Sequence, residues 1–237
     1  MKLRISTYIT RLLTNSLCLL LLFAMPARAQ EKQFSEVPVE EVKTYQGIYV
    51  TLEVAGIINS YILKSDMMST EVQVQANLKN RFFPTIELGY ADCDKVNDSN
   101  DNTYKTSAPY IRIGFDYNVF YKKTHLPGFL NVGLRYGMTS FDYDATSPDM
   151  TDPNYDSRIT VPFSYTGVSG KASWIELVAS LRVKMFKNFY MGWAVRYKRK
   201  ISVDETENTR PWYVPGYGKN EVGTFNLNYN LTYKLPF

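Results

Sequence analysis

The feature that most constrains the fold is a regular alternation of large apolar and polar residues at the C-terminal end of the chain. Large apolar side chains stand at every second position there: Phe225, Leu227, Tyr229, Leu231, Tyr233, Leu235 and Phe237. The residues between them are polar, with Pro236 as the exception. Because successive side chains of a β-strand point to opposite faces of the sheet, this segment is predicted to be a strand with one apolar and one polar face.

The same alternation recurs in earlier segments, which cover residues 48–54, 72–78, 86–90, 111–119, 132–138, 175–183 and 189–197. The connections between these predicted strands alternate in length. Short connections fall at 79–81, 122–127 and 185–188, and long ones at 57–68, 92–107, 141–171 and 202–220. In an up-and-down barrel, odd and even connections lie at opposite ends, so one rim carries short turns and the other long loops. The predicted fold class is therefore all-β, an eight-stranded antiparallel up-and-down transmembrane β-barrel.

The N-terminus has the features of an export signal. A basic start is followed by the apolar run 12–25, and Ala27 and Ala29 are small residues at the positions that a signal peptidase recognises. The apolar run is shorter than the roughly 20 residues that a membrane-spanning helix needs. We expect three parts: a cleaved signal peptide at 1–29, a polar periplasmic leader at 30–46 and an outer-membrane β-barrel domain at 47–237.

The net charge of the chain comes from this signal. The formal charge is +4, and the basic residues Lys2, Arg4, Arg11 and Arg28 all precede Gln30. The rest of the chain holds 23 Lys and Arg against 23 Asp and Glu, so it is neutral. This balance argues against a nucleic-acid partner. Cys93 is the single cysteine after the signal, so we expect no internal disulfide and interpret this residue as an incidental loop position.

Alternation alone leaves open which face of the barrel is apolar. The polar face of the predicted strands carries charges of both signs, at Glu53, Glu87, Arg112, Asp116, Arg135, Glu176, Arg182 and Arg196. Glycines share this face, and aromatic residues concentrate near the strand ends, as in the aromatic girdles of membrane barrels. The interior of an eight-stranded barrel is just wide enough to be filled by side chains. We therefore expect these charged residues to form a structural ion-pair network that fills the lumen.

The terminal strand, which ends in Phe237, resembles the signal by which the outer-membrane assembly machinery recognises its barrel substrates. In size and expected architecture the chain resembles the eight-stranded barrels of the OmpA/OmpX type. Residues 110–118, 133–137, 187–193 and 212–218 are similar to a family of small outer-membrane proteins without an assigned function. The resemblance implies the outer membrane of a Gram-negative cell as location. It also implies outer-membrane lipid, the barrel assembly machinery and periplasmic chaperones as partners, but no activity.

No residue pattern in the chain predicts catalysis. His125, the single histidine, falls in a short turn without the partners of a catalytic triad, so we predict that the protein is not an enzyme and has no cofactor. Aspartates cluster at 92–101 and 142–156, but their spacing matches no known calcium loop and suits solvated turns, so we predict no metal site.

The predicted long loops hold aromatic and proline residues, which include Tyr155, Phe163, Tyr165, Trp212, Tyr213, Pro215 and Tyr217. These side chains suit either a binding surface or packing of the loops against each other. We therefore expect a cell-surface barrel with a filled lumen and a structural or surface-interaction role, whose surface ligand the sequence does not name. A narrow channel for small solutes is the first alternative. A soluble secreted carrier barrel, with its apolar face inward, is the second.

Overall fold

A computed structural model describes residues 43–56, 66–97, 101–123, 125–147, 163–204 and 209–236. The described residues all belong to one compact unit, Val42–Phe237. The predicted signal peptide, most of the predicted leader and the terminal Phe237 lie outside the described residues. Within the described part of the chain, no helix is long and apolar enough to cross a membrane.

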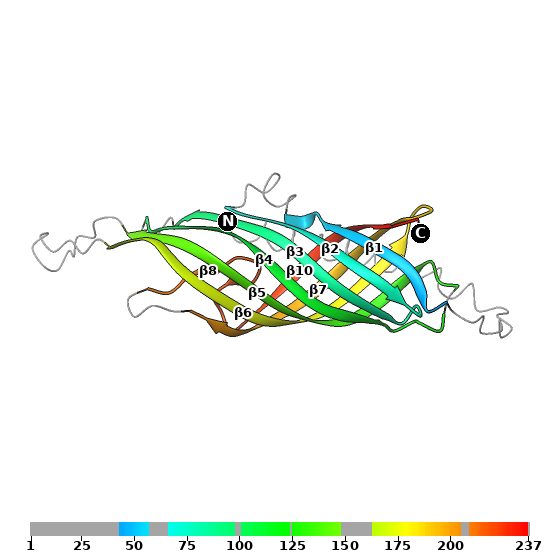
Figure 1. The fold of residues 1–237 in the computed structure, drawn as a ribbon. Helices are drawn as coiled ribbons and strands as arrows, with labels where there is room; N and C mark the ends of the chain where they lie inside the picture. Colours follow the sequence, from blue (N-terminus) through cyan, green and yellow to red (C-terminus); the bar gives the residue numbers. More distant parts are fainter. Residues whose placement is uncertain are drawn as a thin grey trace, which may run out of the picture. The chain divides into compact units, whose positions relative to one another are not determined.

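Antiparallel strands form the wall of a closed barrel (Figure 1). They are β1 (Tyr45–Glu53), β2 (Met67–Leu78), β3 (Phe82–Val96), β4 (Thr103–Asn118), β5 (Gly128–Ser147), β6 (Phe163–Lys184), β7 (Phe189–Val203) and β10 (Gly223–Lys234). Each strand pairs with its neighbours along the chain, apart from the short β8 (Tyr213–Val214) and β9 (Gly218–Lys219), which pair only with each other. The ring closes where β1 pairs with β10 over Tyr49–Glu53. The all-β, antiparallel, eight-stranded part of the predicted fold is thereby confirmed.

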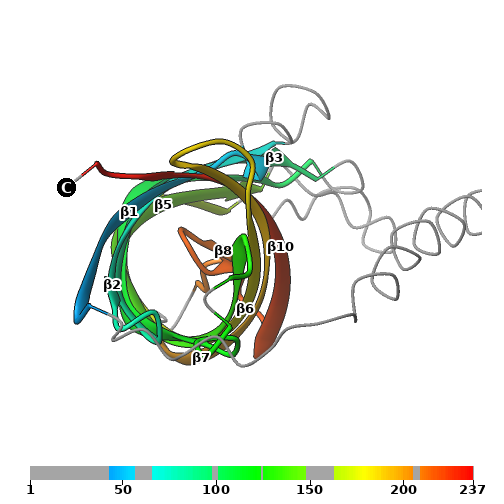
Figure 2. The same ribbon diagram turned by 90° about the vertical axis from the view of Figure 1, so that its right-hand side faces the viewer.

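The β8–β9 hairpin lies inside the ring when the barrel is viewed along its axis (Figure 2). It belongs to the connection between β7 and β10, at the end of the barrel that carries the long connections. Val214 and Tyr217 of this hairpin are almost completely buried. Of the two alternatives for Tyr213, Pro215 and Tyr217, an exposed binding surface does not fit the structure, because this loop folds back into the barrel and buries them.

In the middle of the barrel, the burial of side chains is inverted relative to a soluble protein. On β5, Leu134 points outward and is 51% exposed, whereas its neighbour Arg135 points inward and is 2% exposed. The same holds on β4, where Ile113 is exposed and Arg112 is buried. An apolar band therefore encircles the outside, while the charged residues fill the inside.

Beyond this band, toward the long connections, the two faces exchange character. Further along β5 the exposed residue is Asp142, and the buried ones are Phe141 and Tyr143. On β3 the outward residues Asp92 and Asp94 alternate with the buried residues Ala91 and Cys93. This end of the barrel has an ordinary apolar core, to which the hairpin residues Tyr213, Val214 and Tyr217 belong.

Several predicted boundaries need correction. The connections expected at 92–107 and 141–171 are largely strand, because β3 runs to Val96, β4 starts at Thr103, β5 runs to Ser147 and β6 starts at Phe163. Cys93 is accordingly a buried strand residue rather than a loop residue. β1 begins at Tyr45, inside the segment assigned to the leader, because Tyr45 pairs with Leu78 across a bulge at which Gly47 adopts a φ of 115°.

Candidate functional site

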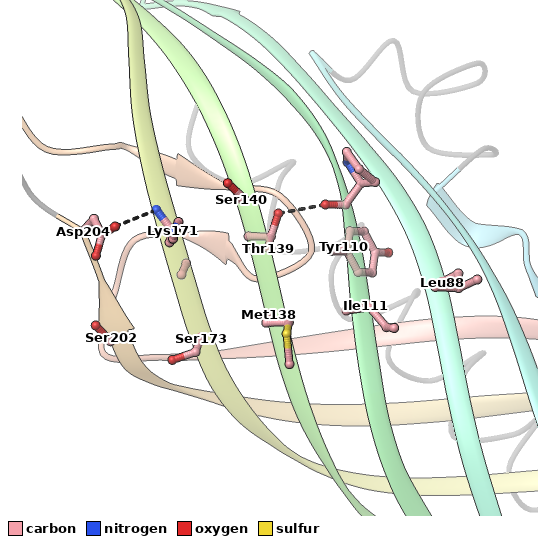
Figure 3. Close-up of a pocket in the computed structure, with 12 residues that line it drawn as sticks. Leu88, Tyr110, Ile111, Met138, Thr139, Ser140, Lys171, Ser173, Ser202 and Asp204 are labelled. Carbon is pink, nitrogen blue, oxygen red and sulfur yellow. Dashed lines mark hydrogen bonds between the residues drawn. The ribbon is translucent and has the colours of Figure 1, made fainter.

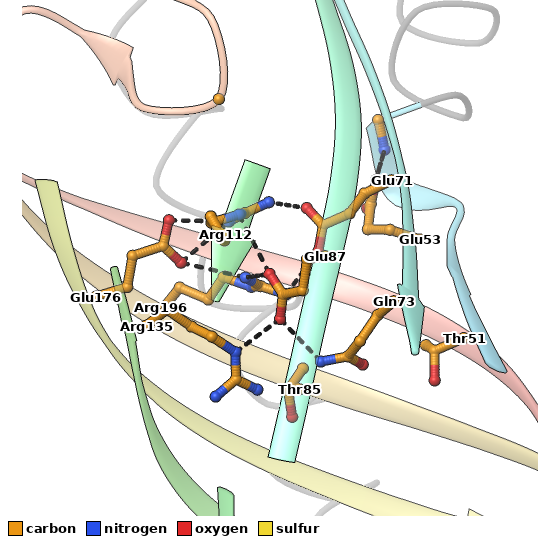
Figure 4. Close-up of polar contacts among 12 residues, drawn as sticks. Thr51, Glu53, Glu71, Gln73, Thr85, Glu87, Arg112, Arg135, Glu176 and Arg196 are labelled. Carbon is orange, nitrogen blue, oxygen red and sulfur yellow. Dashed lines mark hydrogen bonds and ion pairs between the residues drawn. The ribbon is translucent and has the colours of Figure 1, made fainter. Parts of the chain in front are cut away.

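A network of charged side chains fills the middle of the barrel (Figure 4). Each of these residues occupies an inward position of its strand, so the period-two geometry of the wall directs all of them to the axis. Glu87 of β3 lies at the centre and is fully buried. It forms ion pairs with Arg196 at 2.7 Å, Arg135 at 2.9 Å and Arg112 at 3.2 Å, and it accepts a hydrogen bond of 2.8 Å from the amide of Gln73.

Two further carboxylates share the same arginines. Glu176 pairs with Arg112 at 2.9 Å and with Arg196 at 3.1 Å. Glu71 pairs with Arg196 at 2.9 Å and also contacts Arg112. Each of the two arginines thus bridges three carboxylates, and together with Arg135 the network joins strands β2 to β7. Buried charges are costly unless they are paired, and here the opposite charges lie within hydrogen-bond distance.

The network continues toward the short-turn end of the barrel. Arg135 pairs with Asp116 at 2.8 Å. The amide of Gln75 donates to Asp116 at 2.5 Å, and its oxygen accepts a 2.6 Å hydrogen bond from Arg182. Arg182 also lies over the ring of Tyr49, 5.7 Å from its centroid. Tyr49 packs with Phe83, Tyr190 and Phe129 in an aromatic cluster that fills this end of the lumen.

The hairpin covers the network at the opposite end. The turn of the hairpin is held by Lys198, whose ammonium group donates to the carbonyl oxygens of Gly216 at 2.7 Å and Tyr217 at 3.3 Å. Tyr104 donates from its hydroxyl to the carbonyl oxygen of Tyr213 at 2.7 Å. The rings of Tyr217 and Trp174 lie 5.9 Å apart. Because Trp174 donates to Glu176 at 2.6 Å, the hairpin is joined to the network through Trp174.

The structure brings together six of the predicted lumen residues as ion pairs and leaves two outside. The six are Glu87, Arg112, Asp116, Arg135, Glu176 and Arg196. Glu53 instead accepts hydrogen bonds of 3.2 and 3.4 Å from the backbone N–H of Gly56. Arg182 reaches the network through Gln75 rather than through a carboxylate. Both remain buried, in keeping with their inward positions.

Glu71 and Lys198 were not predicted as members of the charged network, although both stand at polar positions of the alternation. Glu71 directly precedes the predicted β2 segment, and Lys198 directly follows the predicted β7 segment. The signal was therefore available in the extended pattern. The role of the hairpin had no such signal, because a Pro–Gly turn with aromatic neighbours is equally common on protein surfaces.

Two small cavities lie beside the charged network in the part of the barrel that the structure describes. One cavity of about 10 Å³ lies among Arg182, Arg196 and Asn230, and one of about 50 Å³ lies between Glu71, Lys198 and the hairpin. Such volumes hold between one and a few water molecules. Among the described residues, no group of three His, Cys, Asp or Glu side chains is arranged to hold a metal ion. The network has charge and rigidity, but these cavities offer no space for an organic substrate.

A larger hollow of about 600 Å³ lies on the barrel wall at the border of the apolar band (Figure 3). Leu88, Ile111 and Met138 line its apolar side. On its polar side, Asp204 accepts a 3.1 Å hydrogen bond from the backbone N–H of Lys171. The small residues Ser140 and Ser173 form part of the lining. The hollow is therefore amphipathic and marks the level at which the outer surface changes from apolar to polar.

Comparison with known proteins places the chain in a family. The family described as "Domain of unknown function (DUF6048)" matches residues 9–237. The chain belongs to the DUF6048 family. The sequence resemblance likewise indicated a family without an assigned function.

Similarity to other proteins of known structure or curated sequence is slight. No curated protein matches this DUF6048 chain by sequence. Among solved structures, the crystal structure of a major outer membrane protein from Thermus thermophilus is similar, with a TM-score of 0.47 and 9% identity. The match covers 80% of this chain and 100% of the Thermus chain.

Proposed function

We propose that this DUF6048 protein is an outer-membrane β-barrel with a filled lumen, which acts as a structural or surface-interaction protein and neither conducts solutes nor catalyses a reaction. The observation that carries the proposal is the exchange of character between the two faces of the same strands. On β5, Leu134 is outside and Arg135 inside, whereas further along Asp142 is outside and Tyr143 inside.

The exchange of apolar and charged residues between the two faces has a direct physical explanation. A wall that faces water on its outside gains free energy by burying apolar side chains and exposing charged ones, as the Asp142 end does. Exposed side chains such as Leu88, Phe115 and Trp193 form a continuous belt in the middle of the barrel, which would drive aggregation in water. The belt suits contact with hydrocarbon. We infer that the membrane covers the middle of the barrel and ends where the outer surface becomes polar.

The orientation follows from the lengths of the connections: 54–66, 148–162 and 204–222 at one end are longer than any connection at the other end, although 97–102 is short. In outer-membrane barrels the short turns face the periplasm and the long connections face outward. Here β3, β4, β5 and β6 extend beyond the apolar band at the end that carries the long connections. This end would project from the cell surface, where it is available for contact with partners. Barrel assembly machinery, periplasmic chaperones and outer-membrane lipid are the further partners that this location implies.

A conducting channel is disfavoured by what fills the lumen. Conduction needs a continuous polar path along the axis. In this barrel the aromatic cluster around Tyr49 fills one end, the ion pairs of Glu87 fill the middle, and the β8–β9 hairpin fills the other end. A narrow channel would require movement of all of these parts. A soluble carrier of the lipocalin type has an apolar interior, whereas the middle of this barrel has a charged one.

The experiment combines fractionation with conductance. The full chain is expressed with its predicted signal, and we expect the processed protein in the carbonate-resistant outer-membrane fraction, extracted by detergent and with heat-modifiable mobility on gels. In planar bilayers the purified protein is expected to give no stable open-channel currents. Recovery as a folded, detergent-free soluble protein would refute the membrane location. Regular open-channel currents that persist when the protein is purified to homogeneity would refute the filled lumen.

A further inference from the structure

The rim of the barrel at the short-turn end carries an unusual concentration of positive charge. The basic residues of this rim are Lys43, Lys79, Arg81, Lys122, Lys123, Lys184, Lys187 and Lys234. All are exposed except Lys234, which is half-buried. We call this set the basic rim. The described segments that form it, 43–48, 77–83, 117–123, 125–131, 182–190 and 231–236, contain no Asp or Glu.

The opposite end of the barrel has a mixed charge. Its outward lysines lie among aspartates: Lys105 pairs with Asp94 at 2.8 Å, and Lys95 lies 3.9 Å from Asp66. Among the described residues, the charges are thus separated along the barrel axis, with unbalanced positive charge at the short-turn end. Such a field attracts anions to the short-turn rim.

The basic residues are spread around the whole circumference of the rim. They occur on each of the three short turns, before β1 and at the end of β10. Neighbouring turns are joined by hydrogen bonds, such as that of 3.2 Å from the Asn80 amide to the carbonyl oxygen of Tyr121. Lys184 likewise donates from its backbone N–H to the carbonyl oxygen of Pro127 at 2.6 Å. A partner that neutralises all of these charges has to surround the barrel.

The basic rim also borders on aromatic and apolar side chains. The guanidinium group of Arg81 lies 4.7 Å from the ring centroid of Tyr121 and 5.1 Å from that of Phe82. Lys123 lies 5.4 Å from the ring of Phe120. Phe186, beside Lys187, is 72% exposed. Aromatic side chains next to cations are typical of the level of lipid headgroups, where the rings contact the acyl boundary and the charges meet phosphate.

We propose that the basic rim binds the phosphate groups of anionic phospholipids in the periplasmic leaflet, which encircle the barrel at this level. The inference rests on the proposed membrane location and adds the class of lipid and the residues that recognise it. A lipid leaflet fits the circular distribution of the charges, whereas a single acidic protein would contact one side of the rim. Each lysine near an anionic surface is expected to contribute about a fivefold increase in lipid binding.

The test compares two variants that lose the same charge. The rim variant carries Lys79→Gln, Lys122→Gln, Lys123→Gln and Lys187→Gln. The control variant carries Lys95→Gln, Lys105→Gln, Lys171→Gln and Lys219→Gln at the opposite end. Both are checked for heat-modifiable mobility, so that unfolded material is excluded.

Native mass spectrometry then measures the binding of phosphatidylglycerol and of phosphatidylcholine with the same acyl chains. We expect the full mature protein and the control variant to prefer phosphatidylglycerol by at least roughly tenfold, and the rim variant to lose most of this preference. Added salt should weaken the preference, because it screens exposed charges. An unchanged preference in the rim variant, or an equal loss in both variants, would overturn the proposal.

The acidic residues of the predicted leader, Glu31, Glu36, Glu40 and Glu41, are the competing partner. Carbodiimide joins carboxylates directly to lysines that they contact. Crosslinks between these glutamates and the rim lysines in reconstituted protein would overturn lipid binding at the rim. Failure of the proposed function has a different signature, because a protein that is not a membrane barrel would not enter phosphatidylcholine bilayers at all.

Discussion

Replacement of Glu87 by glutamine removes one negative charge from the centre of the lumen while it keeps the size of the side chain. Glu87 receives Arg196, Arg135 and Arg112 within 3.2 Å, together with the amide of Gln73. The variant leaves three buried guanidinium groups with too little negative charge. Loss of one partner from a buried ion pair costs about 3–5 kcal/mol, because the remaining charge stays buried without compensation. We expect Glu87→Gln to lower the free energy of unfolding by this amount.

Glu53 provides the matched control. It is also a buried lumen glutamate, but its carboxylate accepts from the backbone N–H of Gly56 and forms no ion pair among the described residues. Glu53→Gln is expected to cost at most about 1.5 kcal/mol, the contribution of an ordinary hydrogen bond. The assay is reversible urea unfolding in lipid vesicles, followed by tryptophan fluorescence. Equal costs of less than about 1 kcal/mol for both variants would show that water screens the network, and would refute the description of a filled lumen.

Three further predictions test the wall, the hairpin and the thiol. Leu134→Arg, in the apolar band, should lower the free energy of unfolding in vesicles by about 2–4 kcal/mol, and Ser140→Arg, at its border, by about 0–1 kcal/mol; equal costs would contradict the position of the membrane. Gly216→Ala should raise hydrogen exchange in residues 211–220 while the barrel stays folded, because Gly216 has a φ of 81° and its added Cβ would lie 2.5 Å from Tyr110; unchanged protection would refute the docked hairpin. Burial, aided by the charge of Asp92, raises the pKa of the Cys93 thiol to about 11, so maleimide should label the folded protein very slowly at pH 7.5 and quickly in urea; rapid labelling of folded protein would contradict its burial.

The strands of the barrel wall could be predicted because their period-two pattern is local. From Ile111 to Val119, for example, every second residue is large and apolar, and the structure places these side chains on the outside of β4 and the short turn that follows. The inward charges such as Arg112 and Asp116 follow from the same parity. Their ion-pair partners did not follow, because pairing across the lumen depends on the register of strands that are distant in sequence.

The full length of the strands could not be predicted from apolar residues at the outward positions alone. Beyond Tyr90 the alternation of β3 continues, but Asp92 and Asp94 take the outward positions and Ala91 and Cys93 the inward ones. If the outside of the barrel is assumed to face the same solvent along its whole length, this exchange of apolar and polar positions is mistaken for the end of the strand. In the proposed membrane location the exchange is expected, because the face that must be apolar changes where a single strand passes from hydrocarbon into water.

Neither the inward position of the hairpin nor the basic rim was predicted from the sequence, and the reasons differ. Inward folding of Tyr213 and Tyr217 depends on contacts with Tyr104, Trp174 and Lys198, which are far away in sequence. The basic rim was present in the sequence but hidden by the neutral total, since charges of opposite sign are separated only once the turns are gathered at one end of the barrel. The net charge of a barrel therefore does not reveal a charged rim, and the charges of the two rims have to be counted separately.

We propose that the same wall contacts lipid with its apolar side chains and encloses its charges, and the chain's own tryptophans test this arrangement. Trp193 is on the outside of β7 and 56% exposed, whereas Trp174 points inward beside Glu176 and is 1% exposed. Two variants, each retaining one of these tryptophans with the other two replaced by phenylalanine, are reconstituted with phospholipids brominated along their acyl chains. We expect strong quenching of Trp193 fluorescence and almost none of Trp174 fluorescence. Equal quenching of both, or a folded protein in which bromolipid does not reach Trp193, would contradict it.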